Sequence, residues 1–296
     1  MHGAGDASFG HRHAAPATRR LGAALALALG FGLVEAAVGW RTNSLALLSD
    51  SVHMLADAAA LALAFAASRI AARPASARHS FGFERAETLA AFVNALAFLL
   101  LMAWLAFEAA LRLRAPEPID AGPALVVAVL GLLVNGAMLA MLRHDHDRLN
   151  TRAALLHVAG DFAASVAAIV AMGAALWGGL RWVDAAMALA VAIMMVPSTV
   201  SVLRAAVPVL MDAVPEGIDF AEVGAALGSL PGVRSVHDLH VWRMTAERVA
   251  LSAHLGVDSL EAWPATLEAA RRTLHERFAI EHATLQPEPA RRAGDA

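Results

Sequence analysis

Six long apolar segments follow one another along the first two thirds of the chain, separated by short connections. They lie at about 21–40, 45–68, 89–111, 123–142, 153–177 and 183–205. Each approaches or exceeds the roughly 20 apolar residues that a helix needs to cross a bilayer. The pattern predicts a six-span transmembrane domain over residues 21–207, preceded by a disordered tail at 1–20.

The pattern changes after Pro208, where charges become regular and the apolar runs shorten. Residues 218–229 predict an amphipathic helix, and residues 233–244 and 248–258 alternate as two strands. A longer helix at 260–278 and a third strand at 280–288 complete an α-β-β-α-β order. This order predicts a small sheet with helices packed on one face. We expect a soluble domain at 208–290 and a short tail at 291–296.

Composition supports a membrane protein, since 58% of the residues are hydrophobic and the mean hydropathy is +0.57. The absence of cysteine excludes disulfides and thiolate metal sites. The net charge of −3 does not suggest a nucleic-acid partner. The short loops and the lack of a recognisable targeting segment favour a bacterial plasma membrane.

Arginines are distributed unequally between the two sides of the predicted bundle. One side holds Arg12, Arg19, Arg20, Arg69, Arg73, Arg78, Arg85, Arg143, Arg148, Arg152 and Arg204, and the other holds Arg41, Arg112, Arg114 and Arg181. Loops rich in basic residues stay in the cytoplasm. Both termini and the soluble domain are therefore expected to be cytoplasmic.

Two of the predicted spans carry the same pair of polar residues, a histidine followed four positions later by an aspartate. His53 and Asp57 lie in one span, and His157 and Asp161 in another. Residues four apart share one face of a helix, and Asp50 lies on the first of these faces. A carboxylate at the middle of a span costs about 2.5–3.5 kcal/mol on insertion scales. Facing each other, the two pairs offer the two nitrogens and two oxygens of a tetrahedral Zn²⁺ site.

A single pair of this kind is equally well explained as an interhelical hydrogen bond, but its duplication favours a metal site. Four protein ligands also argue against catalysis, because catalytic zinc keeps a position open for water. Protons and metal compete for the same imidazole nitrogens, which supports exchange of one for the other. Asn135, within another span, reads as an interhelical hydrogen-bond donor rather than a ligand.

Several segments together resemble the cation diffusion facilitator family of zinc transporters. They are residues 43–63, 79–95, 157–166, 237–242 ("HDLHVW") and 281–288 ("EHATLQPE"). The resemblance implies a homodimer with six spans and a ferredoxin-like, metallochaperone-like cytoplasmic domain. It also implies zinc–proton antiport through His53, Asp57, His157 and Asp161, with Asp50 assisting metal or proton entry.

The resemblance suggests further sites. His237, His254 and His282 match positions that bind zinc at the contact between cytoplasmic domains, with His240 and Glu288 as additional candidates. Arg85 and Asp212 match a charge interlock between spans and soluble domain. Weaker loop candidates are His79, which lacks the partner residues of a second loop site, and His144 and His146, which a charged solvated turn explains better than metal binding does.

The leading interpretation is therefore proton-coupled efflux of Zn²⁺, by a secondary transporter and not an enzyme. The alternatives are a broader divalent exporter that also carries Cd²⁺ or Co²⁺, and a membrane metal sensor. An intramembrane metalloenzyme is disfavoured. The sequence leaves open the rank order of metals, the proton stoichiometry, the affinity and the number of metals in the cytoplasmic domain.

Overall fold

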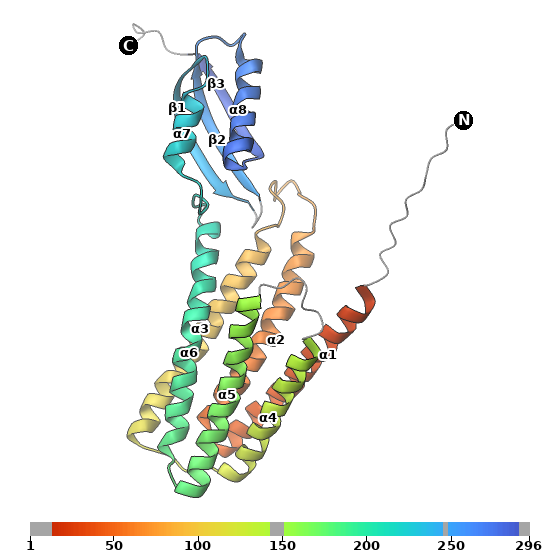
Figure 1. Ribbon diagram of the computed structural model, residues 1–296, viewed down its shortest axis with the longest axis vertical. Coiled ribbons are helices and arrows are strands. Elements are labelled where there is room, and N and C mark those ends of the chain that lie inside the picture. Colours follow the sequence, from red (N-terminus) through yellow and green to blue (C-terminus); the bar gives the residue numbers. More distant parts are fainter. Residues whose placement is uncertain (1–13, 143–150, 245–247, 290–296) are drawn as a thin grey trace, which may run out of the picture. The chain divides into compact units, whose positions relative to one another are not determined.

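The computed structural model describes residues 14–142, 151–244 and 248–289, and the side chains of residues 26–137, 160, 162–244 and 248–289. Six long helices confirm the predicted bundle (Figure 1). The first helix begins at Ala14, so residues 14–20 of the predicted disordered tail are helical, and residues 1–13 lie outside the described residues. They are α1 (Ala14–Thr42), α2 (Leu45–Ala71), α3 (Ala86–Arg114), α4 (Ala121–Leu142), α5 (Thr151–Gly178) and α6 (Trp182–Leu210). Among the fully described stretches, α2, α3 and α6 are long and apolar enough to cross a membrane, and α4 and α5 contain shorter apolar helices.

The chain divides into two compact units, and the first comprises residues 1–62 and 94–200. In this unit α4 packs against both α1 and α5. The helix contacts use small side chains: Ala124 and Ala128 of α4 and Ala168 and Ala171 of α5 are fully buried in one shared core with Leu47 of α2. Alanines let helix backbones approach closely, which is how helices associate inside a membrane.

The second unit comprises residues 63–93 and 201–296 and contains the α/β domain. Its elements are α7 (Phe220–Gly228), β1 (Val233–Arg243), β2 (Val249–Val257), α8 (Trp263–Phe278) and β3 (His282–Pro289), which confirms the predicted order. The strands pair in the order β1-β2-β3, antiparallel between β1 and β2 and parallel between β2 and β3. Because a parallel pair needs a crossover, α8 connects β2 to β3 across the sheet.

The sheet has one covered face and one bare face within the protomer. Helices α7 and α8 contact each other and lie on the same face of the sheet (Figure 1). Leu251, Ala253 and Leu255 of β2 are buried in the core on that side. Since side chains alternate along a strand, the intervening His254 lies on the opposite face, where no described helix covers it.

Candidate functional site

The first half of the predicted metal site lies on α2. His53 and Asp57 are one helical turn apart, with 3.8 Å between His53 Nε2 and Asp57 Oδ2. His53 is 6% exposed and its ring packs beside that of Phe98 on α3, with 5.9 Å between centroids. A buried imidazole and a carboxylate on one face of a spanning helix can together contribute one nitrogen and one oxygen to a cation.

The second half of the predicted site lies on α5. The helix spans Thr151–Gly178 and therefore carries His157 and Asp161 at the same helical spacing. The side chains of both residues lie outside the described residues. The helix itself adjoins α2, because Ser165 of α5 donates a hydrogen bond to Asp50 of α2. Asp161 is one turn away from Ser165 along α5.

Asp50 is held by a chain of hydrogen bonds across three helices. Its side chain is 1% exposed, and its Oδ2 accepts from Ser165 Oγ at 2.9 Å. The same hydroxyl accepts from Asn135 Nδ2 of α4, also at 2.9 Å. This confirms that Asn135 is an interhelical donor. These hydrogen bonds hold the buried carboxylate of Asp50 one turn before His53 on α2. A buried carboxylate needs such a donor, because it has lost the water that would otherwise solvate it.

Two buried carboxylates in the bundle were missed by the sequence analysis. Glu35 of α1 is 0% exposed, and neither carboxylate oxygen has a hydrogen-bond partner among the described residues. It occupies the space left by Gly131, where a Cβ would lie 2.2 Å from Glu35 Oε1. Asp184, at the start of α6, is 1% exposed and binds the start of α2. An acidic residue inside a predicted span was the signal available for both.

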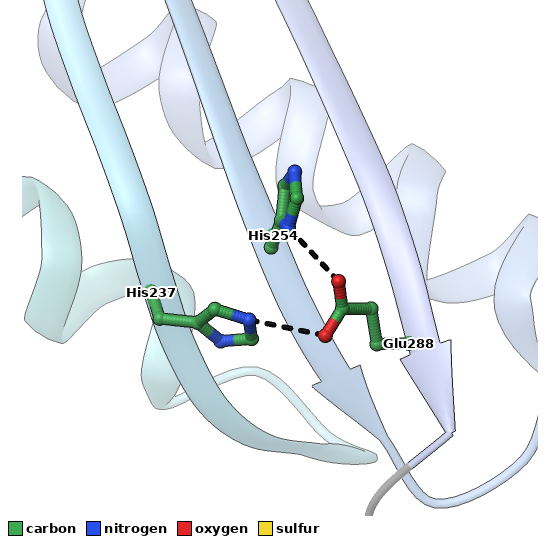
Figure 2. Close-up of side chains that lie close together, drawn as sticks. All are labelled: His237, His254 and Glu288. Carbon is green, nitrogen blue, oxygen red and sulfur yellow. Dashed lines mark hydrogen bonds and ion pairs between the residues drawn. The ribbon is translucent and has the colours of Figure 1, made fainter.

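A second cluster of metal-ligating groups lies on the bare face of the sheet. His237 of β1 and His254 of β2 are register partners, and both contact Glu288 of β3 (Figure 2). Their separations are 3.1 Å from His237 Nε2 to Glu288 Oε2 and 2.9 Å from His254 Nδ1 to Glu288 Oε1. One ligand atom from each residue lies within 4.8 Å of the others. Two nitrogens and one carboxylate oxygen suit Zn²⁺, with a fourth position left over.

His282 does not join this cluster within the protomer. It pairs with Ala250 at the opposite end of β3 from Glu288, and a separation of six positions corresponds to about 20 Å of strand. Within the protomer, Glu288, which the sequence analysis named as an additional candidate, is the β3 residue that contacts His237 and His254. The parallel register of β2 and β3 causes this arrangement, because it sets Gln286 opposite His254.

His240 lies near the cluster and pairs with Asp238, a residue that sequence reasoning did not single out. Asp238 adopts φ = 48° at an irregularity of β1, and its Oδ1 lies 3.0 Å from His240 Nε2. Its Oδ2 is 3.7 Å from His254 Nε2. The hydrogen bond from His240, with the nearby histidine charges, lowers the pKa of Asp238. Two carboxylates thus approach the two nitrogens of His254.

The loop candidates divide into described and undescribed residues. His79 is exposed; its Nδ1 lies 3.4 Å from Ser76 Oγ, and its ring stacks beside Phe83. Among the described residues it belongs to no cluster of three metal-ligating groups. His144 and His146 lie outside the described residues.

The charged residues proposed as an interlock lie together in the second unit. The guanidinium of Arg85, just before α3, contacts the carboxylate of Asp212, just after α6, through two hydrogen bonds. A second pair joins Arg248 Nη1 to Glu84 Oε1 at 3.0 Å. Arg85, Asp212 and Glu84 line a cavity of about 700 Å³ together with Trp242.

Comparisons with known proteins cover nearly the whole chain. Residues 21–211 match the sequence model of the cation efflux transmembrane domain, and residues 215–290 match that of the cation efflux protein, cytoplasmic domain. The metal cation efflux system protein CzcD of Cupriavidus metallidurans is 38% identical over 96% of this chain and 90% of that protein. The zinc transporter ZitB of Escherichia coli is 38% identical over 91% of this chain and 87% of that protein.

Two further similarities extend this set. A cadmium, cobalt and zinc/H(+)-K(+) antiporter of Bacillus subtilis is 33% identical over 95% of this chain and 92% of that protein. Among solved structures, the metal-bound C-terminal domain of the CzcD transporter is 35% identical, covering 24% of this chain and 99% of that chain with a TM-score of 0.23.

Proposed function

The chain belongs to the cation efflux family, also called the cation diffusion facilitator family, and we propose that it exports Zn²⁺ from the cytoplasm in exchange for protons. It is an integral membrane protein, a homodimer and a divalent-cation efflux transporter rather than an enzyme. We propose the identity of the transported ion, its exchange for protons and the residues that bind it. We also propose that the protein lies in a bacterial plasma membrane, with both termini in the cytoplasm.

The observation that carries the proposal is the burial of His53 beside Asp57 within a spanning helix. Inside hydrocarbon, ionisable groups are rare and line the path of an ion or proton. We assign the second pair of ligands to His157 and Asp161 because α5 adjoins α2 and repeats the spacing. The resulting set of two nitrogens and two oxygens is typical of zinc.

Proton coupling follows from the chemistry of the proposed ligands. An imidazole binds metal only when it is neutral, so arrival of Zn²⁺ displaces protons and its departure lets them return. Free imidazole titrates near pH ~6.5, within reach of a physiological proton gradient. Asp50, fixed by Ser165 and Asn135 one turn before His53, supplies negative charge along the approach to the site.

We propose a regulatory role for the cytoplasmic cluster. His237, His254 and Glu288 come from three different strands, and their contacts bring ligand atoms close enough to hold one ion. The cluster lies on the bare face of the sheet, which is the face available to the partner subunit. Zinc bound there would favour one arrangement of the dimer and so couple cytoplasmic zinc to transport.

The test is zinc accumulation in proteoliposomes under an imposed proton gradient. Asp57→Ala is expected to abolish accumulation, whereas Asp120→Ala, an exposed carboxylate outside the bundle core, should leave it intact. Replacing the three cytoplasmic ligands together should reduce accumulation without abolishing it. Accumulation that persists in Asp57→Ala would contradict the proposed site.

The same vesicles distinguish the remaining candidates. The name of the Bacillus relative favours testing Cd²⁺ and Co²⁺ beside Zn²⁺. Comparable accumulation of all three would identify a broad divalent exporter, because affinity order alone does not select zinc. Tight binding with no accumulation in the wild type would identify a sensor instead.

A further inference from the structure

The carboxylate of Asp184 accepts hydrogen bonds from the first turn of α2. Its Oδ2 accepts a hydrogen bond from the backbone nitrogen of Leu45 at 2.7 Å, and its Oδ1 accepts from that of Ala46 at 3.1 Å. Oδ1 also accepts from Ser44 Oγ at 2.8 Å. The carboxylate is 1% exposed, so these three donors replace the water that would otherwise solvate its charge.

Ser44 and Asp184 together satisfy the free backbone donors of the first turn of α2. Ser44 is the N-cap, and its Oγ accepts from the backbone nitrogen of Leu47 at 3.2 Å while donating to Asp184. The first N–H groups of a helix have no partner within the helix. A negative charge at this end is also stabilised by the helix dipole. The start of α2 is therefore bound to one position on α6.

The turn before α2 is held from the other side as well. Asn43, with φ = 58°, accepts a hydrogen bond at its carbonyl from Arg112 Nη1 at 2.8 Å. Its side chain donates to Glu117 Oε2 at 2.8 Å. The backbone carbonyl of Thr42 accepts from the backbone nitrogen of Asp120 at 3.0 Å. Contacts from α3, the α3–α4 loop and α6 thus hold the residues that lead into α2.

We propose that Asp184 is a positioning residue for the transport site, because its carboxylate fixes the start and direction of the helix that carries His53 and Asp57. The inference rests on the proposed function of those two residues. His53 lies eight residues into α2, about 12 Å along its axis. A swing of about 10° at the start of the helix would displace His53 by about 2 Å, whereas metal–ligand distances tolerate about 0.2 Å.

The test compares variants by their KM and Vmax for zinc transport in proteoliposomes. Asp184→Asn keeps the size of the side chain but turns an NH₂ group towards N–H donors, so at least one of the three hydrogen bonds is lost. We expect KM for Zn²⁺ to rise about tenfold or more from misplacement of the ligands, with Vmax nearly unchanged. Ser44→Ala should raise KM less, and Ser44→Thr should restore it.

The matched control is Thr42→Val at the same end of the bundle. Among the described residues, Thr42 Oγ1 donates to backbone carbonyls of α1, at 2.7 Å to Val38, and makes no hydrogen bond to α2. The substitution keeps the backbone carbonyl that accepts from Asp120. This variant should lower the unfolding temperature of the dimer and leave KM unchanged. An unchanged KM in Asp184→Asn, or an equal rise in Thr42→Val, would overturn the proposal. If Asp184→Asn does not fold, the KM of Ser44→Ala decides in the same way.

Asp57→Ala separates failure of this inference from failure of the proposed function. Loss of transport in Asp57→Ala with a normal KM in Asp184→Asn would refute the positioning role alone. Normal transport in Asp57→Ala would refute the transport site itself, and with it the positioning role of Asp184.

Discussion

Arg85 and Asp212 offer a sharp test of coupling between the spans and the soluble domain. Their side chains are 39% and 54% exposed, so this is a solvent-exposed ion pair. Such pairs contribute about 0.2–1 kcal/mol, and two hydrogen bonds between guanidinium and carboxylate favour the upper end. A coupling energy near 1 kcal/mol corresponds to about a fivefold change in an equilibrium constant.

The assay is a double-mutant cycle with Arg85→Gln and Asp212→Asn, measured by denaturant unfolding of the purified dimer and by zinc transport. Asparagine is the right replacement because residue 212 has φ = 52°, a left-handed conformation that Asn adopts more readily than Ala. The coupling energy should shrink in ~1 M salt, where charges are screened beyond about 3 Å. Each single variant should also slow transport.

The control cycle uses Arg234 and Asp258, an exposed ion pair confined to the sheet domain. It should give a similar small coupling in unfolding and no change in transport rate. If Arg85→Gln transports zinc as fast as Arg234→Gln, the charge interlock is refuted. A coupling energy of zero at low salt would refute the pairing itself.

Three further predictions concern single sites. Glu288→Gln should weaken zinc binding by the cytoplasmic cluster about tenfold or more in calorimetry, and unchanged affinity would exclude Glu288 as a ligand. Gly131→Ala should cost about 1 kcal/mol, because its Cβ displaces the carboxylate end of the buried Glu35 side chain, and Glu35→Ala should relieve that loss in unfolding experiments. Asp238→Asn, with chelator present, should lower the unfolding midpoint near pH ~5. The pKa of Asp238 is lower in the folded protein than its unfolded value of 3.8, so the ionised carboxylate stabilises the fold above that pH, and the difference between variant and wild type should shrink as the pH falls below 3.8.

Hydrophobic periodicity predicted the elements well because each element follows from local sequence. The six apolar segments became α1–α6, and alternation after Pro208 predicted three strands and two helices. The spacing of His53 and Asp57 is enough to place both on one helix face, since helical geometry alone decides it.

The composition of the cytoplasmic cluster could not be predicted in the same way. It depends on strand register, which brings Glu288 rather than His282 to His254. The left-handed backbone of Asp238 at an irregularity of β1 turns its carboxylate towards His240 and His254. Neither arrangement follows from local sequence, because both arise from pairing between distant segments. Only the family resemblance named Glu288 as an additional candidate.

The buried acids show a different limit. Glu35 and Asp184 each lie in an apolar segment, and burial of a charge there signals a functional or structural role. Only the structure shows which buried acid has hydrogen-bond donors around it. Asp184 meets three donors at the start of α2, whereas Glu35 has no hydrogen-bond partner among the described residues.

The most direct measurement of the central claim is zinc X-ray absorption on the purified dimer, in a background with His237, His254 and Glu288 all replaced by Ala. The account predicts one zinc per protomer with two imidazole nitrogens, two carboxylate oxygens and no water in the first shell. His157→Ala and Asp161→Ala should each abolish this signal. Zinc retained in both variants, or a site with fewer than two imidazoles, would contradict the proposed transport site.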